Sequence, residues 1–114
     1  MKTLIIFLFA WAITKANAQL TTPDSIATPS GNVVVHPIFH AALVLQWKGK
    51  SIYIDPYNGA DAYKTLPKPD LVLITDIHGD HMDLKTLQGL DLGSATLIVP
   101  QAVADKLPAE WKKK

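Results

Sequence analysis

Eleven residues, LITDIHGDHMD at 73–83, contain a dense group of side chains that can bind divalent metal ions. Within six of these positions the chain carries Asp76, His78, Asp80 and His81. Carboxylate oxygens and imidazole nitrogens are ordinary ligands of zinc, manganese and iron. A lone loop histidine is usually solvated or packed, and an aspartate before a helix is usually a cap. Four such side chains this close together favour a metal site instead.

The backbone of this stretch suggests how the ligands are arranged. If the chain is extended, Asp76, His78 and Asp80 point to one side, and His81 diverges from them toward a second ion. Gly79 would then allow a sharp turn between the two pairs. Two metal ions about 3.5–4 Å apart that share an activated water form a standard hydrolytic device.

The elements around the loop predict an open sheet. The run 70–75 (DLVLIT) is continuously apolar, which is typical of a strand buried on both faces, and ligand sites gather at the carboxyl ends of such strands. Asp83 can cap a short helix after the loop. The other predicted elements are strands at 33–40, 42–47, 51–55 and 94–100, a helical turn within 60–65, and helices at 84–90 and 101–107.

This order predicts an α/β domain with a mixed sheet, in which a front hairpin is followed by β-α-β-α. The KGK sequence between the second and third strands suits a tight hairpin turn. Pro37 marks a bulge, an edge or a strand end.

Composition excludes several classes of function. The chain has 114 residues, 48% hydrophobic and 18% charged, with a formal net charge of +1. It contains no cysteine, so disulfides, thiolate zinc sites and a cysteine nucleophile are excluded. Balanced charge and the absence of arginine give no electrostatic case for nucleic acid as a partner. The sequence does not indicate an oligomeric state.

The first eighteen residues have the layout of a secretory signal peptide. A lysine precedes the apolar run LIIFLFAWAI (4–13), and ANA (16–18) offers a cleavage site after Ala18. A membrane anchor would need roughly 20 apolar residues, and a buried helix is the other alternative. We expect residues 1–18 to be removed, which leaves a periplasmic or secreted protein without a membrane segment. The polar stretch 19–32 is predicted to be a linker, and 33–114 a domain.

At the loop, the sequence resembles a known family. LVLITDIHGDHMD (71–83) looks like the signature of the metallo-β-lactamase superfamily, a strand followed by His-x-His-x-Asp-His. HAALVLQWKGKSIYIDPY (40–57) is similar to the front of its L-ascorbate-6-phosphate lactonase-like branch. The resemblance covers 33–107. It implies the N-terminal half of an αββα sandwich, so that 33–114 would be an incomplete domain.

The resemblance also implies roles for the loop residues. Asp76 and His78 would bind one metal ion, Asp80 and His81 a second, and Asp80 would orient or deprotonate the attacking water. The expected ions are zinc or manganese, with iron as a further candidate. Asp76 stands where the family has a histidine, and its harder oxygen should favour manganese, iron or looser zinc binding. Alternatively, Asp76 makes no contact with the metal.

Two other residues are weaker candidates. Asp55 would accept a hydrogen bond from a metal ligand, or it simply forms a turn. His40 is expected to open a strand and, by resemblance, to face the mouth of the site; packing is the alternative. His36 is expected to be structural. No histidine follows His81, so the family's later ligands are absent and the chain alone should bind metal weakly and hydrolyse little.

Together these features predict an exported metal-dependent hydrolase. Its metal-activated water would attack an ester, a lactone or a related bond of a small-molecule substrate. The alternative is a non-catalytic metal-binding or interaction domain with a degenerate site.

Overall fold

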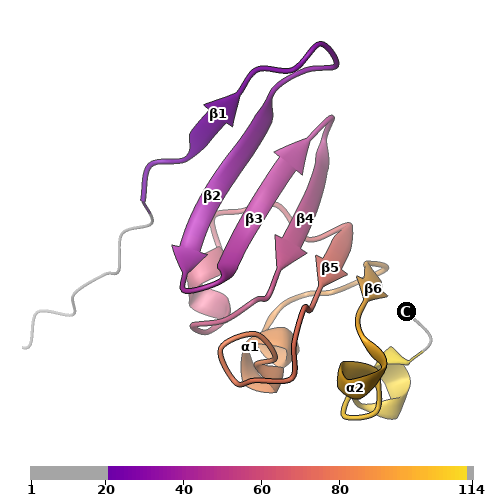
Figure 1. Cartoon of the computed structure of the whole chain (residues 1–114). Coiled ribbons are helices and arrows are strands. Elements are labelled where there is room, and N and C mark those ends of the chain that lie inside the picture. The colour runs from indigo at the N-terminus through magenta and orange to yellow at the C-terminus, as the bar shows by residue number, and fades with distance from the viewer. Residues whose placement is uncertain (1–20, 113–114) are drawn as a thin grey trace, which may run out of the picture.

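The computed structural model describes residues 21–112, which form a mixed six-stranded sheet with short helices packed against it (Figure 1). The strands follow the sheet in chain order, antiparallel from β1 to β4 and parallel from β4 to β6. They are β1 Asp24–Ile26, β2 Val33–Phe39, β3 Ala42–Trp47, β4 Lys50–Ile54, β5 Leu71–Leu73 and β6 Thr96–Ile98. The predicted α/β fold with a front hairpin is therefore confirmed.

The helices are short. They are η1 Ala60–Tyr63, α1 Leu84–Gly89, α2 Gln101–Ala104 and η2 Ala109–Trp111. The predicted signal peptide at 1–18 lies outside the described residues. Within the described part of the chain, no helix has the length and apolar character needed to cross a bilayer.

The hairpin between β3 and β4 has the predicted tight turn. Trp47 pairs with Lys50, so Lys48 and Gly49 form a two-residue loop. Both have positive φ, 49° and 73°, as a type I′ turn requires. The predicted irregularity at Pro37 is also present, as a shift in the register of β2 against β3.

Asp83 caps α1 as predicted. Its side chain accepts hydrogen bonds from the backbone N–H groups of Lys85 and Thr86, at 3.1 and 3.3 Å. The cap fixes where the helix starts, because it satisfies donors that have no partner within the first turn. The helix then places the fully buried Leu87 against the sheet.

The hydrophobic core lies on one face of the sheet. Val44, Tyr53 and Val72 come from three adjacent strands and pack with Leu87 of α1 and Val103 of α2. All five are at most 1% exposed. Burial of side chains of this size supplies most of the free energy that holds the helices to the sheet, about 1.5–3 kcal/mol each.

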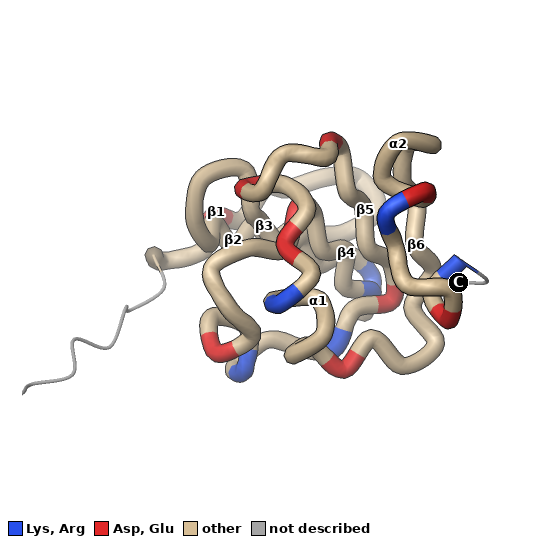
Figure 2. Tube along the Cα trace, turned by 90° about the horizontal axis from the view of Figure 1, so that it is seen from below, with Lys and Arg blue, Asp and Glu red and all other residues tan. Residues whose placement is uncertain are grey.

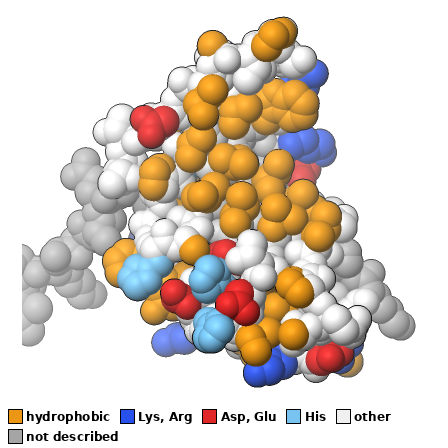
Figure 3. All heavy atoms as spheres, in the orientation of Figure 1, with side chains coloured by type: hydrophobic (Ala, Val, Ile, Leu, Met, Phe, Trp, Pro, Cys, Tyr) orange, Lys and Arg blue, Asp and Glu red, His pale blue; other side chains and the backbone are white. Residues whose placement is uncertain are grey.

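The opposite face of the sheet is apolar but largely uncovered. Leu45 pairs with Ile52 and Ile52 with Leu71, so these side chains share a face, and each is only half-buried. Figure 3 shows a broad hydrophobic surface over this part of the molecule. The prediction that 70–75 is buried on both faces is therefore wrong: Val72 and Ile74 are buried, but Leu71 and Leu73 on the other face are not.

The stretch 19–32, predicted as a linker, contains a strand. β1 pairs with β2, with Asp24 opposite Val35 and Ile26 opposite Val33. All three β1 residues are exposed, so the strand is held by backbone hydrogen bonds and not by burial. This explains why its sequence shows no hydrophobic pattern.

Gly89 lets α1 approach η1 closely. A Cβ atom at Gly89 would lie 2.8 Å from Cβ of Ala60, which is too close. We therefore expect Gly89→Ala to reduce the free energy of unfolding by about 1–3 kcal/mol, despite the better helix propensity of alanine. Urea unfolding would measure this. Gly79→Ala is the matched control, since a Cβ there meets nothing within 4 Å, and it should change stability by no more than about 0.5 kcal/mol. Equal effects of both substitutions would contradict the packing argument.

Candidate metal centre

The candidate ligands lie in the loop between β5 and α1, at the carboxyl end of β5. The loop does not have the extended backbone considered from the sequence. The backbone N–H groups of His81 and Met82 both donate to the carbonyl of His78, at 2.9 and 2.8 Å, so the chain turns within 78–82. The sharp turn expected at Gly79 is therefore present, although Gly79 itself does not have positive φ.

Asp76 and His78 form the first pair of candidate ligands. The Oδ2 atom of Asp76 contacts Nδ1 of His78, and its Oδ1 accepts from the backbone N–H of Ile77 at 2.7 Å. The hydrogen bond to His78, with that from Ile77, holds the pKa of the Asp76 carboxyl below its usual range. Both side chains reach solvent, and that of His78 is 75% exposed. The two residues that the resemblance assigned to one ion are therefore in contact.

His81 is held from behind by a buried carboxylate. Nδ1 of His81 lies 2.8 Å from Oδ2 of Asp55, which is 2% exposed. Asp55 also accepts hydrogen bonds from Thr75, from its backbone N–H at 2.7 Å and from its hydroxyl at 2.6 Å. The hydrogen bond to Asp55 raises the pKa of His81, although partial burial opposes this. Nδ1 is thus engaged and Nε2 is the ring nitrogen left for a ligand.

Asp80 lies between two imidazoles. Its Oδ1 is 3.9 Å from Nε2 of His81, and its Oδ2 is 3.8 Å from Nδ1 of His40. The prediction that His40 opens a strand is wrong. His40 lies in the turn between β2 and β3 and has a φ of 54°. The turn places His40 beside Asp80 of the loop.

These donors suit a divalent ion chemically, but they are arranged in pairs. Nowhere in residues 21–112 do three or more histidine, aspartate or glutamate side chains converge on one position that could hold an ion. The described residues of the loop therefore do not by themselves form a complete coordination shell. Figure 3 shows the histidine and acidic side chains grouped together below the open apolar face.

Comparison with known proteins identifies the family. A family model described as β-lactamase superfamily domain matches residues 35–110, about two thirds of the chain. The chain belongs to the β-lactamase superfamily. The resemblance to the metallo-β-lactamase superfamily seen in the sequence is therefore confirmed. The matched residues include the loop 76–83, which carries the candidate ligands.

A solved structure supports this membership. It is that of a protein from Parabacteroides distasonis ATCC 8503 assigned as a metal-dependent hydrolase, with 35% sequence identity and a TM-score of 0.66. The match covers 75% of this chain but only 40% of the other protein. This chain therefore spans less than half the length of its solved relative. No curated protein matches the chain.

Sequence reasoning missed Thr75. It was included in the apolar run 70–75, yet its hydroxyl donates to Asp55 and lies 3.0 Å from Nδ1 of His81. Its position directly before Asp76, at the end of a strand, was the available signal. His36 lies in β2, as expected of a structural residue, and its Nε2 is buried with no hydrogen-bond partner among the described residues.

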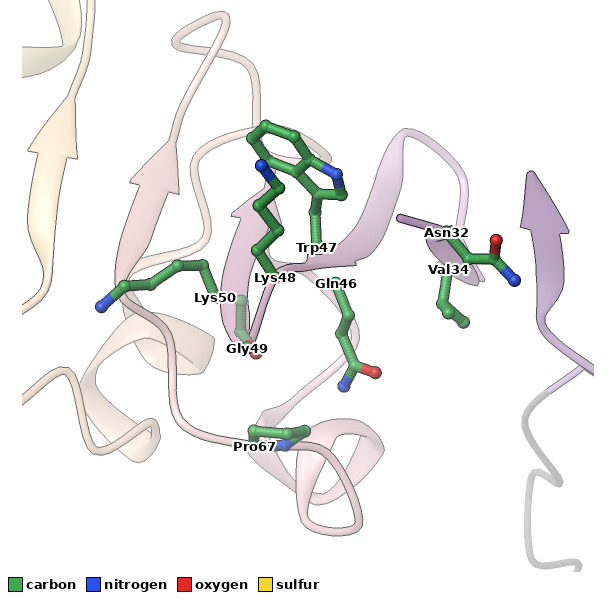
Figure 4. Close-up of a pocket in the computed structure, with 9 residues that line it drawn as sticks. Asn32, Val34, Gln46, Trp47, Lys48, Gly49, Lys50 and Pro67 are labelled. Carbon is green, nitrogen blue, oxygen red and sulfur yellow. The ribbon is translucent and has the colours of Figure 1, made fainter. Parts of the chain in front are cut away.

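Figure 4 shows a shallow cavity of about 250 Å³. It lies at the opposite end of the sheet from the loop 76–83, which carries the candidate ligands. It surrounds the β3–β4 turn, where the ammonium group of Lys48 lies 4.8 Å from the centre of the Trp47 ring. Lys50 turns away toward Asp70, with Nζ 2.7 Å from its Oδ1. The lining has no histidine or carboxylate, so this cavity is not a metal centre.

Replacing Asp55 should lower the pKa of His81. Asp55→Asn removes the negative charge that favours the imidazolium, so NMR titration of the His81 ring in metal-free protein should give a pKa nearer the ordinary value. The raised pKa means that the ion pair stabilises the fold at acidic pH and that this contribution is lost as pH rises through the folded pKa. The stability difference between parent and variant should therefore shrink at higher pH. Asp70→Asn, which alters a carboxylate paired with Lys50, should leave the His81 titration unchanged.

Proposed function

We propose that this chain provides the metal-ligating loop of an exported metal-dependent hydrolase that cleaves an ester, a lactone or a related bond. The observation that carries the proposal is the contact of the buried Asp55 carboxylate with Nδ1 of His81. Metal-binding histidines usually donate their second ring N–H to a carboxylate, which fixes the tautomer and orients the free nitrogen. Superfamily membership and the solved relative support the metal-dependent hydrolase part of this proposal.

The four loop residues divide into two pairs. Asp76 and His78 would hold one ion, and Asp80 and His81 the other. A bound metal would activate a water molecule and polarise the bond to be cleaved. Asp80 is partly exposed and contacts His40 and His81 without a close hydrogen bond, so its carboxylate is free to orient a water molecule and accept its proton. Zinc or manganese is the expected ion, and iron a further candidate, because Asp76 supplies a hard oxygen.

The complete site would need ligands from additional polypeptide. Three features support this: the loop offers pairs of donors, the match covers 40% of the solved relative, and one face of the sheet is apolar and open. A further layer against that face could deliver the missing ligands, because the face borders the loop (Figure 3). This chain alone would bind metal weakly and hydrolyse little.

The substrate would be a small molecule with a hydrolysable carbonyl group. The similarity of 40–57 to the lactonase-like branch favours a cyclic ester. A phosphorylated substrate would need its clamp from elsewhere, because this chain has no arginine.

Export is part of the proposal. We infer that residues 1–18 are cleaved after Ala18 and that the remainder is periplasmic or secreted. Mass spectrometry of the N-terminus after expression in a Gram-negative host should find a chain that starts at Gln19. A protein retained in the cytoplasm with Met1 intact would contradict this.

Metal binding is the direct test. Paramagnetic Mn²⁺, added to the isotope-labelled chain, should selectively broaden the NMR signals of His78 and His81 and those of their loop neighbours. His78→Ala should weaken the effect without unfolding the protein, because this side chain is largely exposed. Broadening spread evenly over all surface carboxylates, or none at the loop, would rule the metal centre out.

A non-catalytic metal-binding or interaction domain is the second candidate. It is favoured by the same absence of three converging ligands within residues 21–112. Hydrolysis of p-nitrophenyl acetate by the Mn²⁺-loaded full-length protein, with the additional polypeptide that completes the site, separates the two functions. Slow turnover that stops with chelator supports the hydrolase, whereas bound metal without any chelator-sensitive turnover supports the domain without activity.

Asp76→His should move metal preference toward zinc. The substitution replaces a hard oxygen with an imidazole nitrogen, so the ratio of Zn²⁺ to Mn²⁺ affinity, measured by calorimetry, should rise. Asp24→His is the matched control, because it places a histidine on β1 at the far edge of the sheet. If both variants behave alike, or if Asp76→His keeps the parent's ratio, Asp76 is not a ligand.

A further inference from the structure

Three aromatic rings gather beside the ligand loop. Phe39 ends β2, His40 follows it in the β2–β3 turn, and Tyr57 lies in the loop after β4. The ring centres of Phe39 and Tyr57 are 6.0 Å apart, and the two ring planes are nearly parallel. The ring centre of His40 lies 4.3 Å from that of Phe39 and 5.8 Å from that of Tyr57. We call these three side chains the aromatic shelf.

The shelf faces solvent but is held in place by the backbone. Phe39 is 46% exposed and the side chain of His40 is 53% exposed. The backbone of Tyr57 is held by the hydroxyl of the buried Tyr63, which accepts from the Tyr57 N–H and donates to the Tyr57 C=O, both at 2.9 Å, and this limits where the Tyr57 ring can lie. Aromatic side chains that are fixed before binding lose little conformational entropy when a ligand packs on them.

The shelf and the loop are at the same end of the sheet. Nδ1 of His40 is 3.8 Å from Asp80, so one member of the shelf touches the loop directly. Positive φ at His40, Asp55 and Asn58 marks the two turns that bring the strands' ends together here. Non-glycine residues rarely adopt this conformation, and such residues cluster at ligand-binding sites.

We propose that the aromatic shelf binds the ring of the substrate and selects an uncharged ester or lactone that carries a flat ring. Aromatic faces favour flat apolar groups through stacking. The loop 76–83 has three carboxylates and no lysine, so the loop of the metal-free chain disfavours an anionic ligand. The inference rests on the proposed function, since it takes the loop as the centre of reaction.

Binding of a non-hydrolysable analogue tests the shelf. N-benzylacetamide carries a flat ring and an amide in place of the ester, N-butylacetamide lacks the ring, and benzoate adds a negative charge. With the labelled chain, N-benzylacetamide should shift the NMR signals of Phe39, His40 and Tyr57, and it should bind more tightly than either other probe. Phe39→Leu should weaken its binding about three- to tenfold.

Trp47→Leu is the matched control. Trp47 is similarly exposed, at 39%, but lies at the opposite end of the sheet, so this change should leave the affinity as it was. Shifts centred on Trp47 or on the open sheet face, equal affinity for the three probes, or parent-like affinity in Phe39→Leu would overturn the proposal. If Phe39→Leu does not fold, Tyr57→Leu is used with the same expectation.

A Mn²⁺ titration of the same samples keeps the two proposals apart. Phe39→Leu should retain the parent's broadening at His78 and His81, because Phe39 holds no metal. Ring binding without any Mn²⁺ effect would reject the metal centre and leave the shelf as a ligand site. A Mn²⁺ effect without ring binding would reject the shelf alone.

Discussion

The buried carboxylate of Asp55 ties together the parts of the molecule on which the candidate site depends. It accepts two hydrogen bonds from Thr75 and contacts His81, while its own N–H donates to the carbonyl of Leu73 at 2.9 Å. These contacts join the end of β4 to the end of β5 and to the loop beyond it. A charged group buried this deeply is stable only when it is well paired, so the loop and the sheet stabilise one another here.

The sheet itself is stabilised from one side. Tyr53, Val72 and Leu87 lie in a closed core, whereas the apolar side chains of the other face remain partly in water. Figure 3 shows mainly hydrophobic side chains over that face. The charged residues are spread along the chain, as Figure 2 shows. A contiguous apolar surface of this kind is uncommon on soluble monomers and usually contacts another surface. The loop that carries the candidate ligands lies at the border of this surface (Figure 3).

Sequence reasoning predicted the features that local chemistry determines. The hairpin at Lys48–Gly49 and the cap at Asp83 both follow from residue type and spacing. It missed β1 because exposed strands carry no hydrophobic pattern. It also predicted an extended loop, since alternation of ligands does not reveal the hydrogen bonds to the His78 carbonyl that turn the chain. The partnership of Thr75 with Asp55 joins residues 20 positions apart, and only the folded sheet brings them into contact.

Position 55 combines two demands that few residues meet together. Its φ of 45° is a left-handed conformation that glycine, asparagine and aspartate tolerate best. Its neighbours also require a negative charge, which glycine and asparagine lack and which glutamate could supply only with a longer side chain and a less tolerant backbone. In evolutionary terms, relatives that keep this loop should vary little at position 55, even while the exposed residues around it change.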